Sequence, residues 1–193
     1  MGNLKGTKTL TNLMKAFAGE SQARNRYTWF ASKAAKEGYR QIEFIFSETA
    51  DQEREHAQRL YRLMGESGEE IEITASFPAG PERDTLTNLK DAAAGENHEY
   101  AVMYPEFARV ADAEGLPDIA SVFRAIAVAE KFHEERYLGL AKNIAEGKVF
   151  KKDTKIKWRC RNCGCIVEST EAPEKCPACD HPRAYFEMLG VNW

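Results

Sequence analysis

Long apolar runs are missing from this sequence. No stretch of its 193 residues approaches the ~18 consecutive apolar residues of a membrane-spanning helix. The opening residues, Met1 to Gly6, lack the apolar core of a signal peptide, and position 6 is not the Ser or Thr of the acylation pattern. We therefore expect a cytoplasmic protein that is neither secreted nor attached to a membrane.

Cysteine is absent from the first 159 residues, and all five cysteines lie between Cys160 and Cys179. A tight, odd-numbered cluster in an unsecreted chain is typical of a metal site rather than of a disulfide scaffold. Residues 148–193 also hold nine Lys/Arg against six Asp/Glu, a net charge of +3, so residues 1–147 carry −6 of the total of −3. This change of composition predicts a linker over 148–156 and a small domain over 157–193.

Residues 7–147 contain few helix breakers and are rich in Ala, Glu, Arg, Gln and Leu, which favour helices. Apolar residues recur every three or four positions, and breakers separate four predicted helices at 7–37, 40–64, 85–114 and 117–146. Two connections are short and the middle one is long. Residues 1–147 are therefore predicted to form a ferritin-like four-helix bundle, with a crossover between the second and third helices.

An internal repeat supports this arrangement. Shifting residues 27–63 by 77 positions gives 13 identities in 37 places, among them Tyr27/Tyr104, Glu53/Glu130 and His56/His133. Just upstream, the match of Glu20 to Glu96 needs a shift of 76. Amphipathic helices share apolar residues by chance, but coincident Tyr, Glu, His and Gly indicate a duplication and an approximate two-fold axis.

The repeat carries a candidate pair of metal sites. Each Glu-x-x-His pair lies on one helix face, and the other helix of each hairpin offers a Glu at about the same depth. Buried carboxylates need compensating charge, and two metal ions supply it: two ferrous ions, or two ferric ions with an oxo bridge, carry +4. Mixed carboxylate and imidazole donors favour iron or manganese. The candidate ligands are Glu20, Glu53, His56, Glu96, Glu130 and His133.

One position breaks the symmetry. Glu99 follows Glu96 by three residues, whereas Ala23 follows Glu20, so one metal has an extra carboxylate available. Tyr27 and Tyr104 lie two helical turns beyond Glu20 and Glu96, from where they can hydrogen-bond ligand carboxylates or act as core aromatics.

Cys160, Cys163, Cys176 and Cys179 form two C-x-x-C knuckles, and four such thiolates make a tetrahedral site. Spacing alone leaves iron and zinc open. Trp158, Phe186 and Trp193 provide aromatic packing for a domain that is too small to fold without its metal. Cys165 is surplus to the site and is expected to be a free thiol.

These residues resemble those of the rubrerythrin family over essentially the whole chain. The resemblance lies in the runs at 18–27 and 48–56, in Ala129-Glu130-Lys131-Phe132-His133, and in the knuckles with the terminal Leu-Gly-Val-Asn-Trp; Cys165 departs from it, standing where an aromatic is expected. It implies iron in a rubredoxin-like tail and a di-iron site that includes Glu99, with Glu53 and Glu130 bridging. One iron would exchange Glu99 for His56 on reduction.

The resemblance further implies a homodimeric, cytoplasmic peroxidase that reduces hydrogen peroxide to water and protects against oxidative stress. Electrons would come from rubredoxin or from an NAD(P)H-dependent reductase, with one subunit's tail serving the other's bundle. Two alternatives stay open: an iron-oxidising protein of the ferritin-like class, and a nucleic-acid-binding zinc ribbon on a structural bundle. The net acidity argues against the second, so no nucleic-acid partner is expected.

Overall fold

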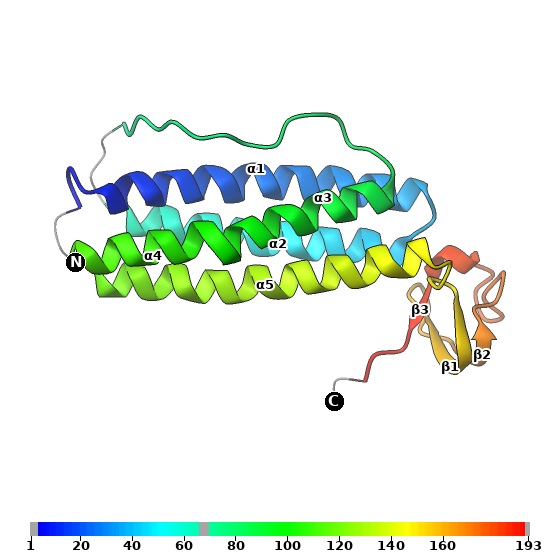
Figure 1. The fold of residues 1–193 in the computed structure, drawn as a ribbon. Helices are drawn as coiled ribbons and strands as arrows, with labels where there is room; N and C mark the ends of the chain where they lie inside the picture. Colours follow the sequence, from blue (N-terminus) through cyan, green and yellow to red (C-terminus); the bar gives the residue numbers. More distant parts are fainter. Residues whose placement is uncertain (1–3, 66–69, 192–193) are drawn as a thin grey trace.

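The computed structural model describes residues 4–65 and 70–191, so the predicted packing of Trp193 lies outside the described residues. Four helical columns form a long bundle, and a small domain sits at one end of it (Figure 1). None of the described helices is long and apolar enough to span a membrane. The bundle comprises α1 (Lys8–Lys36), α2 (Arg40–Leu63), α3 (Thr85–His98), η1 (Glu99–Met103), α4 (Tyr104–Ala113) and α5 (Pro117–Ala145).

Local signals set the helix limits. The side chains of Thr7 and Asp84 cap α1 and α3 by accepting hydrogen bonds from the amides of Leu10 and Thr87. Gly38 and Gly115 close the two short hairpins with φ of 84° and 74°, a region that side chains disfavour. Each hairpin therefore turns at a glycine repeated at the same place in both halves of the sequence.

The predicted third helix, 85–114, is not continuous. A π-helical segment, Glu99–Met103, interrupts it between α3 and α4. A π turn accommodates one extra residue within a helical column. This extra residue accounts for the shift between the repeats, since Tyr27 follows Glu20 by seven residues and Tyr104 follows Glu96 by eight.

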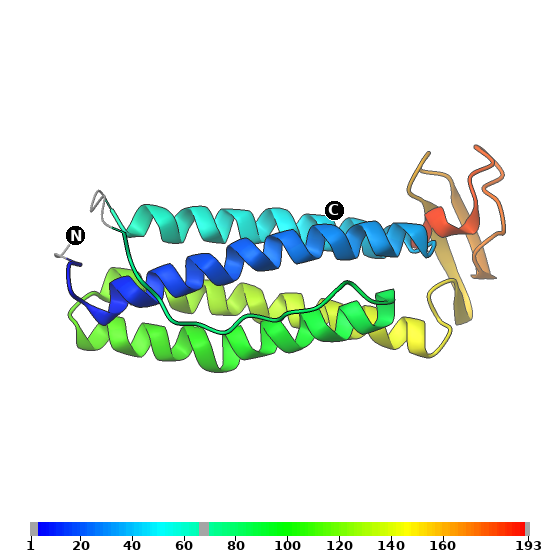
Figure 2. The same ribbon diagram turned by 90° about the horizontal axis from the view of Figure 1, so that it is seen from above.

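The crossover, residues 70–84, has no helix or strand and runs back along the outside of the bundle beside α1 and the α3–α4 column (Figure 2). It connects the two hairpins in the order that the sequence predicted. Inside the bundle the apolar core falls into two clusters, one around Leu13, Leu60 and Phe123 and the other around Phe46 and Leu89. Buried carboxylates lie between these clusters.

The tail forms a three-stranded antiparallel sheet in the order β2-β1-β3, built from β1 (Lys151–Cys160), β2 (Ile166–Glu171) and β3 (Phe186–Met188), with a 3-10 turn, η2 (Arg183–Tyr185), before β3. The segment predicted to be a linker, 148–156, overlaps the first strand of this sheet, because β1 begins at Lys151. A register irregularity between Lys151 and Ile156 disrupts the alternation that would have marked the strand.

The small domain packs against the end of its own bundle. Arg161 lies 4.1 Å from the ring centroid of Phe44 on α2, and Arg40 lies 5.0 Å from that of Tyr185. A Cβ atom on Gly38 would lie 3.8 Å from the side chain of Ala184, so the hairpin turn and the small domain are in close contact. The four-cysteine site is thereby held at the turn end of α1 and α2.

Candidate metal centres

Four helices bring six of the predicted ligands together at mid-bundle. Their donor atoms form two groups, each with all donors within 4.8 Å of one another: Glu20, Glu53, His56 and Glu130 in one, and Glu53, Glu96, Glu130 and His133 in the other. The helical spacing explains the convergence, since each Glu-x-x-His pair spans one turn on one face. Two neighbouring cation sites that share two carboxylates follow from this arrangement.

The shared carboxylates each divide their oxygens between the two halves. Glu53 places Oε2 3.1 Å and Oε1 3.2 Å from the Nδ1 atoms of His56 and His133, respectively. Glu130 places Oε1 3.0 Å from Nδ1 of His56 and Oε2 2.7 Å from Nδ1 of His133. This is the geometry expected of two bridging carboxylates between two metal ions.

The other two carboxylates are held from behind by tyrosines. Tyr27 donates its hydroxyl to Oε1 of Glu96, and Tyr104 donates to Oε1 of Glu20. The remaining Oε2 atoms face the histidines, 3.6 Å from His56 for Glu20 and 3.7 Å from His133 for Glu96. Each tyrosine thus fixes one oxygen of a carboxylate and leaves the other directed into the site.

The unpaired donors fit a pair of cations. Although several of them lie close to one another, buried Oε2 of Glu20 and Glu96, Oε1 of Glu53, both oxygens of Glu130 and Nδ1 of His133 make no hydrogen bond of regular geometry with any described residue. Burial, followed by the charge of Glu53, raises the pKa of Glu20 to about 7. Burial lowers the pKa of His133, but the carboxylates of Glu130, Glu53 and Glu96 outweigh it and raise the value to about 12. The site needs positive charge, which two divalent or trivalent metal ions provide.

Glu99 lies beside the two groups rather than within them. Glu99 is half-buried and lines a cavity of about 1050 Å³. This cavity lies between the crossover and the columns formed by α1 and by α3–α4. Burial, followed by the charge of Glu20, raises its pKa well above the usual range. The π-helical segment η1 is the element that positions this carboxyl group.

The sequence did not reveal the role of Gln52. Its Oε1 atom lies 3.0 Å from Nε2 of His133, on the side of the ring that faces away from the carboxylates. The only available signal was a break in the repeat, because the position equivalent to Gln52 is Ala129.

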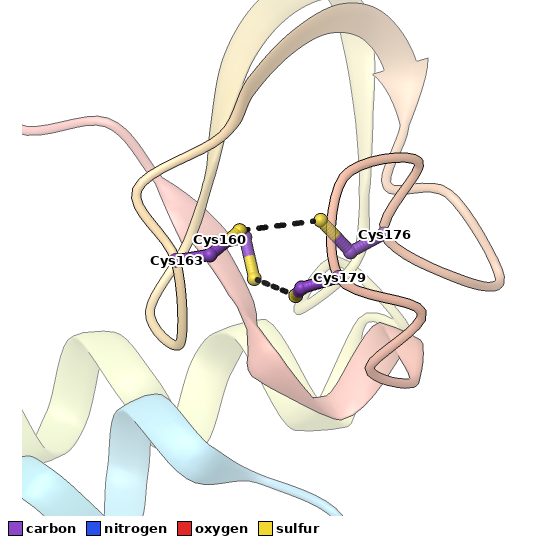
Figure 3. Close-up of side chains that lie close together, drawn as sticks. All are labelled: Cys160, Cys163, Cys176 and Cys179. Carbon is purple, nitrogen blue, oxygen red and sulfur yellow. Dashed lines mark hydrogen bonds between the residues drawn. The ribbon is translucent and has the colours of Figure 1, made fainter.

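The four knuckle cysteines also converge (Figure 3). Sγ of Cys160 lies 3.8 Å from that of Cys179, and Sγ of Cys163 lies 3.6 Å from that of Cys176. Metal–sulfur bonds of about 2.3 Å place the sulfurs of a tetrahedron about 3.8 Å apart, so the spacing fits a single metal ion. The amide of His181 helps to lower the pKa of Cys179 to about 6, which favours the ligating thiolate.

Cys165 stands outside this group. It is partly buried against the core of the small domain, and its backbone carbonyl accepts a hydrogen bond from the amide of Cys160. Burial raises the pKa of its thiol, in contrast with Cys179. Cys165 therefore contributes to the turn and the packing of the knuckle.

The hairpin–crossover–hairpin bundle with a carboxylate–histidine cluster at its centre defines a ferritin-like di-iron protein, here joined to a rubredoxin-like domain. Comparison with known proteins specifies the family. A family model described as "Rubrerythrin" matches residues 11–141, and one described as "Rubrerythrin, rubredoxin-like domain" matches residues 158–187.

Individual relatives agree. The chain is 58% identical to a rubrerythrin of Nitratidesulfovibrio vulgaris, with 100% of both chains covered, and 59% identical to a rubrerythrin of Clostridium perfringens, with 98% of both covered. A solved structure of nigerythrin in a mixed-valence state is 37% identical with a TM-score of 0.64, covering 95% of this chain and 87% of that one. A bacterioferritin of Desulfovibrio desulfuricans, 21% identical with a TM-score of 0.68 over 77% of this chain and 87% of that one, shares the fold.

The chain belongs to the rubrerythrin family. It carries a di-iron site in the Glu/His cluster of the bundle and a four-cysteine site in a rubredoxin-like domain suited to electron transfer.

Proposed function

We propose that this protein reduces hydrogen peroxide to water in the cytoplasm, by H2O2 + 2 H+ + 2 e− → 2 H2O, and so protects the cell against oxidative stress. The observation that supports this most is that Glu53 and Glu130 each face both histidines, because two metals held side by side can act on the two oxygens of one peroxide. A bound ferrous pair would supply the two electrons and the positive charge that stabilises the departing oxygen.

The protein side chains would hold this pair in place. Glu53 and Glu130 would bridge the metals, with Glu20 and His56 completing one site and Glu96 and His133 the other. Tyr27 and Tyr104 keep Glu96 and Glu20 oriented by hydrogen bonds from the opposite hairpin. The apolar clusters on either side limit access of water from the two ends of the bundle. Glu99, at the cavity, is the seventh proposed ligand.

Electrons would arrive through an iron ion in the four-cysteine site, supplied by rubredoxin or by an NAD(P)H-dependent reductase. In one chain the small domain contacts α2 at Phe44, twelve residues before His56. At 1.5 Å per residue this separation is about 18 Å along the helix, too long for direct contact. A head-to-tail homodimer, in which the tail of one subunit lies beside the bundle of the other, would shorten the path.

Stopped-flow mixing of the reduced, iron-loaded protein with peroxide tests the reaction. We expect oxidation of the bundle iron to be much faster with peroxide than with dioxygen, and to be lost in Glu53→Ala while the four-cysteine iron remains. Faster oxidation by dioxygen, together with release or storage of ferric iron, would instead favour the ferroxidase alternative.

A mixing experiment tests the dimer. Cys176→Ser subunits lack the tail iron, and Glu53→Ala subunits lack a working bundle site. A mixed dimer should regain reductase-linked peroxidase activity, because the intact tail of one subunit serves the intact bundle of the other. Activity that stays at the level of the separate variants would show that each tail serves its own bundle.

A further inference from the structure

The two histidines of the cluster differ on the side that faces away from the carboxylates. Nε2 of His133 lies 3.0 Å from Oε1 of Gln52, while within residues 4–65 and 70–191 no hydrogen bond reaches Nε2 of His56. The side chain of His56 is also more exposed, at 19% against 4% for His133. The pseudo-symmetric site thus holds one imidazole firmly and the other loosely.

The internal repeat shows how this difference arises. Residue 52 is Gln on α2, and its counterpart on α5 is Ala129, which cannot accept a hydrogen bond from His56. A second contact between α5 and α2, close to His133, also lacks a counterpart close to His56. Arg136 on α5 donates hydrogen bonds to Glu48 and Thr49 of α2, at 2.6 Å and 2.9 Å.

The reciprocal contact is missing. The counterpart of Arg136 is Arg59, which is exposed and has no ion pair or hydrogen bond in the described part of the chain. Its expected partners are replaced by Ala125 and Ile126. Polar side chains of α2 therefore bond to α5 around His133, whereas the equivalent positions on α5 carry no polar side chain that could bond to α2 around His56.

We propose that Gln52 is a positioning residue that fixes the ring of His133 for metal binding, and that Ala129 at the equivalent place leaves the ring of His56 without such a hydrogen bond. Gln52 can fix His133 because its hydrogen bond selects one tautomer of the imidazole ring. A neutral imidazole that binds a metal through Nδ1 carries its proton on Nε2, and Oε1 of Gln52 accepts that proton's hydrogen bond. The hydrogen bond fixes both the tautomer and the orientation of the ring. This inference rests on the proposed ligand roles of the two histidines.

Zinc-loaded protein labelled with 15N in histidine tests the inference without peroxide. We expect a slowly exchanging Nε2–H signal from His133 and a rapidly exchanging one from His56. Gln52→Ala should speed exchange at His133 at least ~10-fold and weaken binding of one of the two bundle zinc ions by ~10–100-fold. Gln52→Glu, which keeps an acceptor, should restore slow exchange.

Gln58→Ala, an exposed glutamine on the same helix, is the matched control and should change neither quantity. Ala129→Gln should slow exchange at His56. Unchanged exchange and zinc affinity in Gln52→Ala, or equal effects in Gln58→Ala, would overturn the proposal. A protein that shows the histidine difference but fails to reduce peroxide would overturn the proposed function alone, because neither zinc readout depends on catalysis.

Discussion

Tyr27 on α1 donates its hydroxyl to Oε1 of Glu96 on α3, so a residue of the first hairpin orients a carboxylate of the second. Tyr104 on α4 returns the contact to Glu20 on α1. The two halves of the duplicated chain are therefore joined through the metal site itself. Metal binding and the packing of the hairpins should be coupled as a result.

Tyr27→Phe should weaken both the packing of the two hairpins and the binding of metal. Removal of the hydroxyl leaves Oε1 of Glu96 buried without its donor, which costs about 1–3 kcal/mol of stability. Binding of one bundle metal should weaken by ~10-fold, because the carboxylate loses its fixed orientation. Chemical denaturation and metal titration measure the two effects. Tyr61→Phe is the control, since Tyr61 is 63% exposed; an equal loss there would contradict the explanation.

The metal-free protein should become less stable as pH rises. The pKa of Glu20 is raised from 4.5 to about 7 and that of His133 from 6.5 to about 12, so the folded state binds more protons than the unfolded state across this range. Stability is therefore greatest below about pH 4.5 as far as these groups are concerned, and is lost as pH rises through the folded-state values.

Urea denaturation of metal-free protein at pH 5.5, 7 and 8.5 measures this trend, and we expect a loss of at least about 1 kcal/mol over the series. Loading with ferrous iron under anaerobic conditions should remove or reverse the trend, because metal binding competes with protons. Stability of the metal-free protein that increases between pH 5.5 and 8.5 would refute the proposed electrostatics.

Glu99→Gln should affect one metal of the pair. The substitution keeps the size of the side chain but replaces the carboxyl group of the seventh proposed ligand by an amide, which binds iron more weakly. Ferrous-ion titration should show one of the two bundle sites weakened by at least ~10-fold, with the other and the four-cysteine site unchanged. Glu106→Gln serves as the control, because Glu106 forms an exposed surface pair with Arg109. Equal weakening of both bundle sites would show that Glu99 does not belong to one metal.

Cys176→Ser should abolish the iron site of the small domain. The four sulfurs lie 3.6–3.8 Å apart in pairs, and removal of one leaves three ligands in a domain that depends on its metal for folding. The red colour of ferric four-thiolate iron should disappear while the bundle retains its helical content. Cys165→Ser should keep the colour, because Cys165 lies outside the group. A colourless wild-type protein with full metal occupancy would indicate zinc.

The repeat and the helical periodicity predicted the bundle, its crossover and the six residues that converge at its centre, because each depends on spacing along single helices. Two features could not be found in this way. The π segment at Glu99–Met103 left only a change of shift from 77 to 76 residues, and β1 was hidden by an irregular register near Ile156. In both cases one or a few residues alter the local geometry without a strong compositional signal.

The sequence by itself determined which donor atoms the protein has, on which helix faces they lie, and that two symmetric sets exist, since 3.6 residues per turn fixes the face of every side chain. Only the tertiary structure decided the partners across the bundle: Tyr27 with Glu96, Tyr104 with Glu20, and Gln52 with His133. These contacts depend on the distance and axial alignment between helices. Packing of all four columns sets that alignment, and no single segment encodes it.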